Sequence, residues 1–210
     1  MLSLKSLDVK YTFYLLPQIE TMKIDQSWTL FLDRDGVINK RIPDDYVRNV
    51  SQFSFLRGSL EAIVQLNNIF GLVVVVTNQQ GIGKGLMTQA DVDSVHDYLI
   101  RQVEKEGGCI ERVYICPALA KDNAICRKPK PGMGLQAKED FPLIDFKRSV
   151  MVGDSISDME FGIGLGMKTV LIETKIDIDR AKIPVVDYRF SSLWDFARSF
   201  QFVDVGLVDS

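Results

Sequence analysis

Residues 28–39 read WTLFLDRDGVIN, a short apolar run that ends in two aspartates and a glycine. Buried strands of α/β proteins have this pattern, so residues 28–32 predict a central strand. Asp33 then lies at the carboxyl end of that strand, where open α/β sheets form their ligand crevices. Because side chains alternate along a strand, Asp33 and Asp35 are expected to face one pocket while Arg34 turns away. An isolated Asp-x-Asp-Gly also favours a surface turn, so this stretch alone leaves both interpretations open.

The composition is that of one globular domain without a surface for nucleic acid or membrane. The 210 residues are 46% hydrophobic, enough for a sizeable core, and no apolar run reaches the length of a membrane span. The formal net charge of −3 gives no global positive field, so neither nucleic acid nor a membrane is expected as a partner. Three cysteines without a secretion signal predict a reducing cytoplasm rather than a disulfide framework. No heptad repeat persists, and the oligomeric state is left open.

The first 27 residues are expected to form an N-terminal extension to the domain. Residues 11–16 are apolar but too short for a signal sequence. Met22 lies just before the first predicted strand, and residues 1–22 are expected to add little to function. The alternative is an extra strand or hairpin against the domain. The predicted division is an extension at 1–27, a domain at 28–200 and a tail at 201–210.

Apolar strands and amphipathic helices alternate along the rest of the chain. Strands are predicted at 72–76, 112–116, 149–152, 169–172 and 188–190. Helices are predicted at 58–70, ended by Gly71, at 88–106 with Thr88 as N-cap, near 133–140, up to about 164, and at 191–200. His96, the only histidine, is expected to be partly exposed on the second helix and without a catalytic role. The alternation indicates one doubly wound α/β domain, a Rossmann-like parallel sheet with helices on both faces.

Polar motifs follow four of the predicted strands, and in a parallel sheet these carboxyl ends lie along one edge. The motifs are Asp33-Arg34-Asp35, Thr77-Asn78, Arg127-Lys128 and Gly153-Asp154. Three carboxylates there, Asp33, Asp35 and Asp154, would repel one another unless a cation held them, and hard oxygen ligands suit Mg²⁺. Lys128 and the Thr77 hydroxyl can cradle phosphate oxygens. Taken alone, Lys128 also fits a solvated loop lysine.

These motifs, in this order and with the last extended to Gly153-Asp154-Ser155-Ile156-Ser157-Asp158, resemble the signature of the haloacid dehalogenase (HAD) superfamily of phosphohydrolases. The resemblance covers roughly residues 28–200. Within the superfamily, residues 33–39, 76–82 and 126–133 are similar to subfamily IIIA, the heptose 1,7-bisphosphate and histidinol-phosphate phosphatases. The intervals between the motifs hold no large cap module. The resemblance therefore implies a capless enzyme whose surface loops select the substrate.

The resemblance also implies a catalytic role for each motif. Asp33 would be the nucleophile that forms an aspartyl-phosphate, and Asp35 would protonate the leaving alcohol and then activate water. Mg²⁺ would be held by Asp33, by the backbone carbonyl of Asp35, and by Asp154. Thr77 and Lys128 would bind the transferring phosphoryl group.

Other residues are implied around the substrate. Asp158 would partner the motif lysine or a metal-bound water, although it also fits an exposed residue in the first turn of a helix. Arg127 would reach the substrate at its second phosphate or at a hydroxyl. Asn78 and the loop from Arg41 to Asp44 would line the sugar site.

The chain departs from subfamily IIIA in the zinc loop, which usually reads Cys-x-His followed later by Cys-x-Cys. Here the two halves are Cys116-Pro117-Ala118 and Ala124-Ile125-Cys126, so two of the four ligands remain. A structural zinc site needs four such ligands. No zinc is therefore expected, and Cys116 and Cys126 are interpreted as small apolar residues left over from the motif.

Together these features predict a cytoplasmic, Mg²⁺-dependent phosphomonoesterase that acts on a small-molecule phosphate ester. D-glycero-D-manno-heptose 1,7-bisphosphate, cleaved at position 7, is the expected substrate, and histidinol phosphate or another small metabolite is the alternative. A phosphatase for nucleic-acid ends would need a basic groove, which the net charge does not indicate. A binding protein that has lost catalysis is the alternative of another class, and the intact motifs argue against it.

Overall fold

A six-stranded parallel sheet forms the centre of the computed structural model, which describes residues 13–15, 23–174 and 182–202. The strand order is β5-β4-β3-β6-β7-β8, and every neighbouring pair is parallel. Its strands are β3 (Thr29–Leu32), β4 (Leu72–Asn78), β5 (Arg112–Cys116), β6 (Ser149–Gly153), β7 (Lys168–Ile172) and β8 (Tyr188–Phe190). The predicted central strand is therefore β3, and the doubly wound parallel sheet is confirmed.

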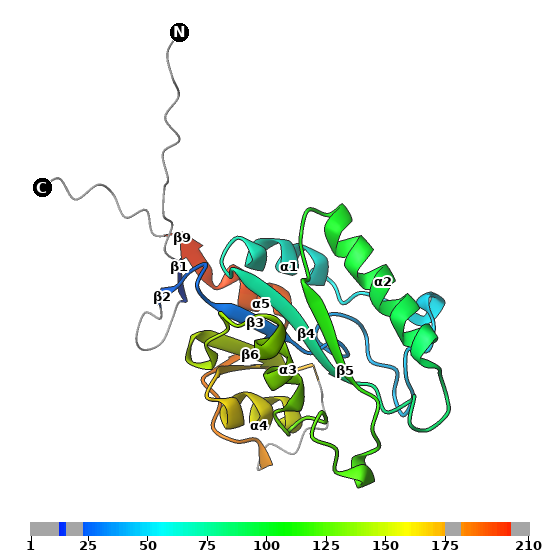
Figure 1. The fold of residues 1–210 in the computed structure, drawn as a ribbon. Helices are drawn as coiled ribbons and strands as arrows, with labels where there is room; N and C mark the ends of the chain where they lie inside the picture. The colour runs from blue at the N-terminus through cyan, green and yellow to red at the C-terminus, as the bar shows by residue number, and fades with distance from the viewer. Residues whose placement is uncertain (1–12, 16–22, 175–181, 203–210) are drawn as a thin grey trace, which may run out of the picture.

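Helices cover both faces of this sheet (Figure 1). One face is covered by α1 (Ser59–Asn67), α2 (Gln89–Lys105) and α5 (Leu193–Arg198), and the other by α3 (Gly132–Asp140) and α4 (Ile156–Leu165). Short 3₁₀ helices in the described connections include η1 (Val50–Gln52), η2 (Ala120–Asp122) and η3 (Phe146–Arg148).

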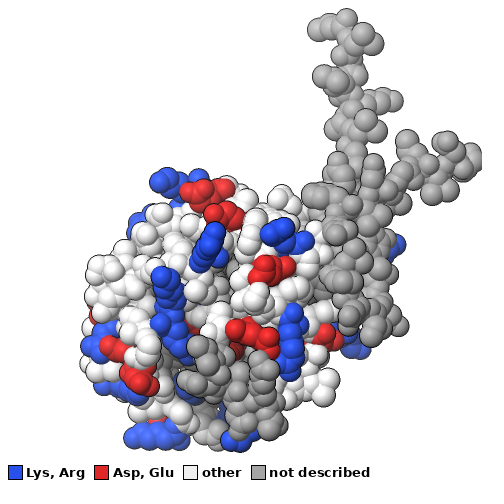
Figure 2. Space-filling model, turned by 180° about the vertical axis from the view of Figure 1, so that it is seen from behind, with Lys and Arg blue, Asp and Glu red and all other residues white. Residues whose placement is uncertain are grey.

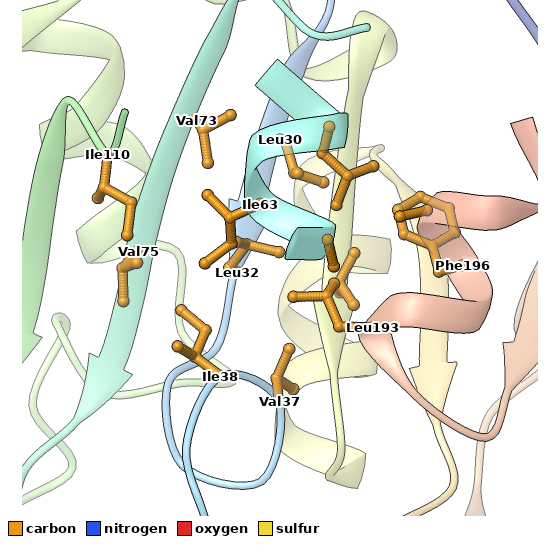
Figure 3. Close-up of a cluster of buried hydrophobic side chains, with 14 of the residues drawn as sticks. Leu30, Leu32, Val37, Ile38, Ile63, Val73, Val75, Ile110, Leu193 and Phe196 are labelled. Atoms are coloured by element: carbon orange, nitrogen blue, oxygen red, sulfur yellow. The ribbon is translucent and has the colours of Figure 1, made fainter. Parts of the chain in front are cut away.

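Alternation along β3 divides the hydrophobic core into two layers. Leu30 and Leu32 point to the face of α1 and α5, where Figure 3 shows Ile63, Leu193 and Phe196 packed against the sheet. Phe31, between the two leucines, belongs to the opposite layer under α3 and α4. Because both faces are buried, β3 carries apolar side chains in both layers, as expected of a central parallel strand.

Capping residues explain where the helices begin and end, and they correct the prediction for α1. Thr88 caps α2 in a reciprocal pair with Asp91, so that predicted N-cap is confirmed. The predicted end of α1 at Gly71 is wrong, because α1 ends at Asn67. Gly71 instead precedes β4, where a Cβ atom would stand 2.0 Å from the carbonyl oxygen of Gln26. This glycine therefore permits a close approach of two backbones rather than a helix cap.

A second, antiparallel sheet joins the two ends of the described chain. Its order is β2 (Lys23–Ile24), β1 (Phe13–Leu15) and β9 (Phe200–Phe202), and it adjoins the amino end of β3. Short stretches of the predicted extension and tail are thus strands, while residues 1–12, 16–22 and 203–210 lie outside the described residues. The helix predicted at 191–200 is shorter in the structure, where α5 spans Leu193–Arg198. Phe200, the last residue of the predicted helix, begins β9 instead. The division into extension, domain and tail stays a prediction.

Acidic and basic side chains are interspersed on the face of the molecule that Figure 2 shows. Within the described ranges, no helix is both long enough and apolar enough to cross a membrane.

Candidate active site

The carboxyl ends of β3, β4 and β6 bring the predicted motifs to one edge of the sheet. Leu32 of β3 stands beside Val75 of β4 and Val152 of β6, so the residues that follow these strands are neighbours. The backbone N–H of Asp33 donates to the carbonyl of Val152 at 2.9 Å. A pocket of about 280 Å³ opens at this edge. It is lined by Asp33, Asp35, Arg41, Ile42, Asp45, Tyr46, Val47, Thr77, Asn78, Gln80, Arg127, Lys128, Ser155, Ser157 and Asp158.

Lys128 is a buried lysine that links two carboxylates. Its side chain is 2% exposed, and its Nζ lies 2.8 Å from Oδ1 of Asp33 and 2.6 Å from Oδ1 of Asp158. It also donates to the carbonyl of Val76 at 2.7 Å. Asn78 fixes the backbone of Lys128 through two hydrogen bonds: the Lys128 N–H donates to Oδ1 of Asn78, and Nδ2 of Asn78 donates to the Lys128 carbonyl. The alternative of a solvated loop lysine is thereby excluded.

Burial dominates the electrostatics of the Asp33 carboxyl. Burial, together with repulsion from Asp158 and Asp154, raises the pKa of Asp33 to about 7, although Lys128 acts in the opposite direction. For Lys128, burial would lower the pKa, but the carboxylates of Asp158 and Asp33 outweigh it and raise the pKa. A cation beside Asp33 therefore favours the ionised carboxylate that nucleophilic attack requires.

Carboxylate oxygens of Asp33, Asp154 and Asp158 lie within 4.8 Å of one another, close enough to hold one metal ion. All three residues are buried, and oxygen ligands of this kind suit Mg²⁺. Two glycines make the cluster compact. A Cβ atom at Gly36, whose φ is +95°, would stand 2.0 Å from Oδ2 of Asp154, and one at Gly153 would stand 2.2 Å from Cβ of Asp158. The residues present therefore fit a hard divalent cation.

Arg41 already places a positive group at this cluster. Its Nη2 lies 2.7 Å from Oδ1 of Asp154 and donates to the backbone carbonyl of Asp35 at 2.9 Å. Burial would lower the pKa of Arg41, but Asp154 and the other carboxylates raise it. The guanidinium thus contacts two of the oxygens that the sequence assigned to Mg²⁺.

The Asp35 carboxylate is not a member of the cluster of three carboxylates, because it is held by donors of its own. Its carboxylate accepts from Arg34 (Nη2, 2.8 and 3.0 Å), from Asn39 (2.9 Å) and from Gln79 (3.0 Å). Burial would raise the pKa of Asp35, but these donors outweigh it and lower the pKa. Asp35 still lines the pocket, as does Asp33, while Arg34 does not.

The predicted substrate residues divide into those that reach the pocket and one that does not. Asn78, Arg127 and Arg41 line it. Asp44 lies in the same loop as Arg41 but outside the lining, where its neighbour Asp45 is found. Asp158 is 1% exposed, so the alternative of an exposed residue in a helical turn is wrong. It stands in the first turn of α4 and also accepts from the backbone N–H of Ser155.

Comparison with known proteins places this geometry in a family. Residues 125–188 match the HAD-hydrolase-like family model. The D-glycero-α-D-manno-heptose-1,7-bisphosphate 7-phosphatase of Mycobacterium tuberculosis is 39% identical over 81% of this chain and 90% of its own length. The D-glycero-β-D-manno-heptose-1,7-bisphosphate 7-phosphatase of Pasteurella multocida is 36% identical over 80% of this chain and 94% of its own length. The chain belongs to this family of HAD-type phosphatases.

The solved structures agree with the family. The crystal structure of the D,D-heptose 1,7-bisphosphate phosphatase of Bordetella bronchiseptica, in complex with magnesium and phosphate, has a TM-score of 0.73 and 30% identity. The alignment covers 81% of this chain and 96% of that one. The crystal structure of a HAD-like phosphatase from Mesorhizobium loti has a TM-score of 0.67 and 26% identity. The alignment covers 92% of this chain and 94% of that one. The protein is thus a phosphoric monoester hydrolase of the HAD type.

The cysteine loop of this family member differs from the sequence-based interpretation. Cys116, at the end of β5, and Cys126, just before Arg127, form a disulfide with their Cα atoms 5.3 Å apart. The interpretation of two unpaired apolar residues is therefore wrong, and so is the expectation that the cysteines form no disulfide. The bond ties the loop that carries Lys128 to the sheet edge, and Cys109 is a free thiol. The expectation of no zinc stays a prediction.

Some residues of the site are not among those predicted from the sequence. Gln79 donates both to Asp35 and to the Thr77 hydroxyl (2.9 Å), and Asn39 is fully buried beside Asp35. Both flank predicted motifs, so a polar residue next to a motif is the signal that could have found them. Tyr46 and Ser157 also line the pocket. Ser157 belongs to the last predicted motif, at the start of α4, whereas no pattern distinguishes Tyr46 from an ordinary loop residue.

Proposed function

We propose that this protein hydrolyses D-glycero-D-manno-heptose 1,7-bisphosphate at position 7, through a phosphorylated Asp33. The observation that carries the proposal is the buried contact of Lys128 with Asp33 at the floor of the pocket. A lysine held there can bind the phosphoryl oxygens as charge develops on them during transfer. The names of the family's members at 32–39% identity support the substrate.

Each residue then has a chemical task. Asp33 attacks phosphorus as the bond to the sugar oxygen breaks, and Asp35 protonates that departing oxygen and later takes a proton from the attacking water. Thr77 and Lys128 hold phosphoryl oxygens in line with Asp33. Asp158 keeps Lys128 charged and oriented, since its carboxylate contacts Nζ at 2.6 Å.

The metal proposal follows from the oxygen cluster. Asp33, Asp154 and the backbone carbonyl of Asp35 would hold Mg²⁺, in accord with the magnesium bound in the Bordetella crystal structure. Bound there, the ion supplies positive charge that neutralises the phosphate ester. Zinc has no part in this proposal.

Substrate selection is assigned to the open rim of the pocket. Arg127, Arg41 and Asn78 line that rim and offer donors to a second phosphate or to sugar hydroxyls. Asp44, which lies outside the lining, is assigned a supporting place in the loop of Arg41. The cytoplasm remains the proposed compartment.

Turnover of a substrate panel tests these assignments. Wild-type protein with Mg²⁺ is expected to prefer the heptose bisphosphate over histidinol phosphate, and both anomers should be compared because relatives of both kinds match. Asp33→Asn is expected to abolish turnover while the protein stays folded. Equal and feeble rates on all phosphate esters would contradict the substrate, and substantial turnover by Asp33→Asn would contradict the nucleophile.

A further inference from the structure

Arg34 is a completely buried arginine beside the active site, and its guanidinium contacts two side chains, Asp35 and His96. Its Nε and Nη2 donate to the carboxylate of Asp35, at distances from 2.8 to 3.3 Å. Its Nη1 lies 2.9 Å from Nε2 of His96 on α2. A buried charge requires partners for its donors. His96 is therefore the partner on the side of Arg34 that Asp35 does not reach.

The chemistry of the pair fixes the state of His96. An arginine has donors but no acceptor, so Nε2 of His96 must accept the hydrogen bond and the ring proton must be on Nδ1. Burial, together with the charge of Arg34, lowers the pKa of His96 to about 3. The imidazole is therefore neutral throughout the physiological range. This corrects the expectation of a partly exposed residue, because His96 is only 6% exposed.

We infer that His96 is a positioning residue, which through Arg34 holds the carboxylate of Asp35 in its working orientation. The inference rests on the proposed function, in which Asp35 is the general acid and base. Asn39 donates to Oδ1 of Asp35 and Gln79 to Oδ2, while Arg34 spans both oxygens. The plane of the carboxylate is thus set mainly by the plane of the guanidinium. Without an acceptor at position 96, the buried Nη1 would be unsatisfied, and the guanidinium would turn to find one.

If His96 served only to pack α2 against the sheet, an apolar residue of similar size could replace it. The buried stripe of α2 consists of Val92, Val95, Leu99 and Val103, and it suffices to pack the helix on the sheet. A leucine of similar volume at position 96 would preserve that packing. Only the acceptor atom would be lost, which gives a way to separate packing from positioning.

Three variants use this difference. His96→Leu keeps the volume and removes the acceptor, whereas His96→Gln keeps a side-chain acceptor. Val103→Ala is the matched control, since Val103 is fully buried on the same helix and does not line the pocket. Turnover is measured with heptose 1,7-bisphosphate and Mg²⁺, and stability is measured by urea unfolding.

The expected result is a change in kcat without a change in KM. His96→Leu should lower kcat roughly 10- to 100-fold, because misplacement of a reacting group by about 1 Å has that effect. His96→Gln should restore most of the loss, and Val103→Ala should keep wild-type kcat despite its lower stability. A folded His96→Leu variant with wild-type kcat, or an equal loss in Leu and Gln variants, would overturn the inference.

A spectroscopic readout separates this inference from the proposed function. The chain has one histidine, so ring ¹⁵N signals report His96 alone. The expected signature is a neutral ring protonated at Nδ1, with Nε2 shifted by the hydrogen bond from Arg34. A ring protonated at Nε2 would overturn the inference, whatever the activity. If wild-type protein shows this signature but hydrolyses neither the heptose bisphosphate nor para-nitrophenyl phosphate, the proposed function fails while the contact of His96 stands.

Discussion

The Nζ atom of Lys128 lies 2.8 Å from Oδ1 of Asp33, and both side chains are buried. The contact joins a loop between β5 and α3 to the end of the central strand, 95 residues apart in sequence. Because Asp158 approaches the same nitrogen, one lysine balances two buried carboxylates. Removing a single partner from such a cluster leaves uncompensated charge in the interior.

Lys128→Met is therefore expected to impair both stability and catalysis. We expect the free energy of unfolding to fall by about 3–5 kcal/mol, the usual cost of breaking a buried pair. We expect kcat to fall at least about 100-fold, since a donor to the phosphoryl group is lost. Urea unfolding and steady-state kinetics measure the two effects. Lys130→Met, two residues away and outside the pocket lining, is the control; an equally mild effect of both variants would contradict the assigned role.

Arg41 competes with a divalent cation for the same oxygens, so its removal should strengthen metal binding. Arg41→Gln is expected to bind Mn²⁺ or Mg²⁺ about 3- to 10-fold more tightly, which corresponds to the loss of one charge-assisted contact. Calorimetry with the metal alone, or paramagnetic resonance with Mn²⁺, measures this directly. The KM for substrate should rise, because Arg41 lines the pocket. Arg48→Gln, whose arginine pairs with Asp45, is the control. Weaker metal binding by Arg41→Gln would contradict the prediction.

His96 should make the fold sensitive to acid. Its pKa is about 3 in the folded protein against about 6.5 when unfolded, so the unfolded chain binds more protons between these values. The contribution to stability is complete above about pH 6.5 and is lost as the pH falls toward 3, by at most about 1.4 kcal/mol per pH unit. Urea unfolding between pH 7 and 4.5 should show a flatter acid limb for His96→Gln than for wild type. Parallel curves would contradict the prediction.

The disulfide should contribute measurable stability. The two cysteines are 10 residues apart in sequence, and closing a loop of this size stabilises a fold by about 2–3 kcal/mol. A phosphine reductant, or the double variant Cys116→Ala/Cys126→Ala, should lower the free energy of unfolding by this amount. Cys109→Ser removes the free thiol and should have little effect. Denatured, unreduced protein should show one reactive thiol. Three thiols in freshly lysed cells would instead indicate that the bond is absent in the reducing compartment.

The positions of the strands and of the catalytic motifs were predictable from the sequence for physical reasons. A parallel strand covered on both faces must be largely apolar, so β3 and β4 stand out as continuous runs. The polar residues that follow them must lie at one edge of the sheet. The sequence alone therefore suffices to place Asp33 and Thr77 near each other.

Contacts made beyond the ends of regular elements were not predictable. Asp35 lines the pocket as strand alternation predicted, but alternation could not reveal that the buried Arg34 donates to its carboxylate. Helical periodicity identified the buried stripe of α2 but not the partner of His96 at its margin. The pairing of Cys116 with Cys126 depends on the path of the loop between them, which composition does not specify.

The order of strands in the small sheet has a consequence for how the chain folds. β1 is the middle strand, paired with β2 on one side and with β9 on the other. The first pairing is local, whereas the second joins residue 13 to residue 202 and so requires two segments that are far apart in sequence to meet. The six-stranded sheet can assemble earlier, because its last strand ends at Phe190. We therefore expect the pairing of β1 with β9 to form after the six-stranded sheet, and deletion of either strand would remove it.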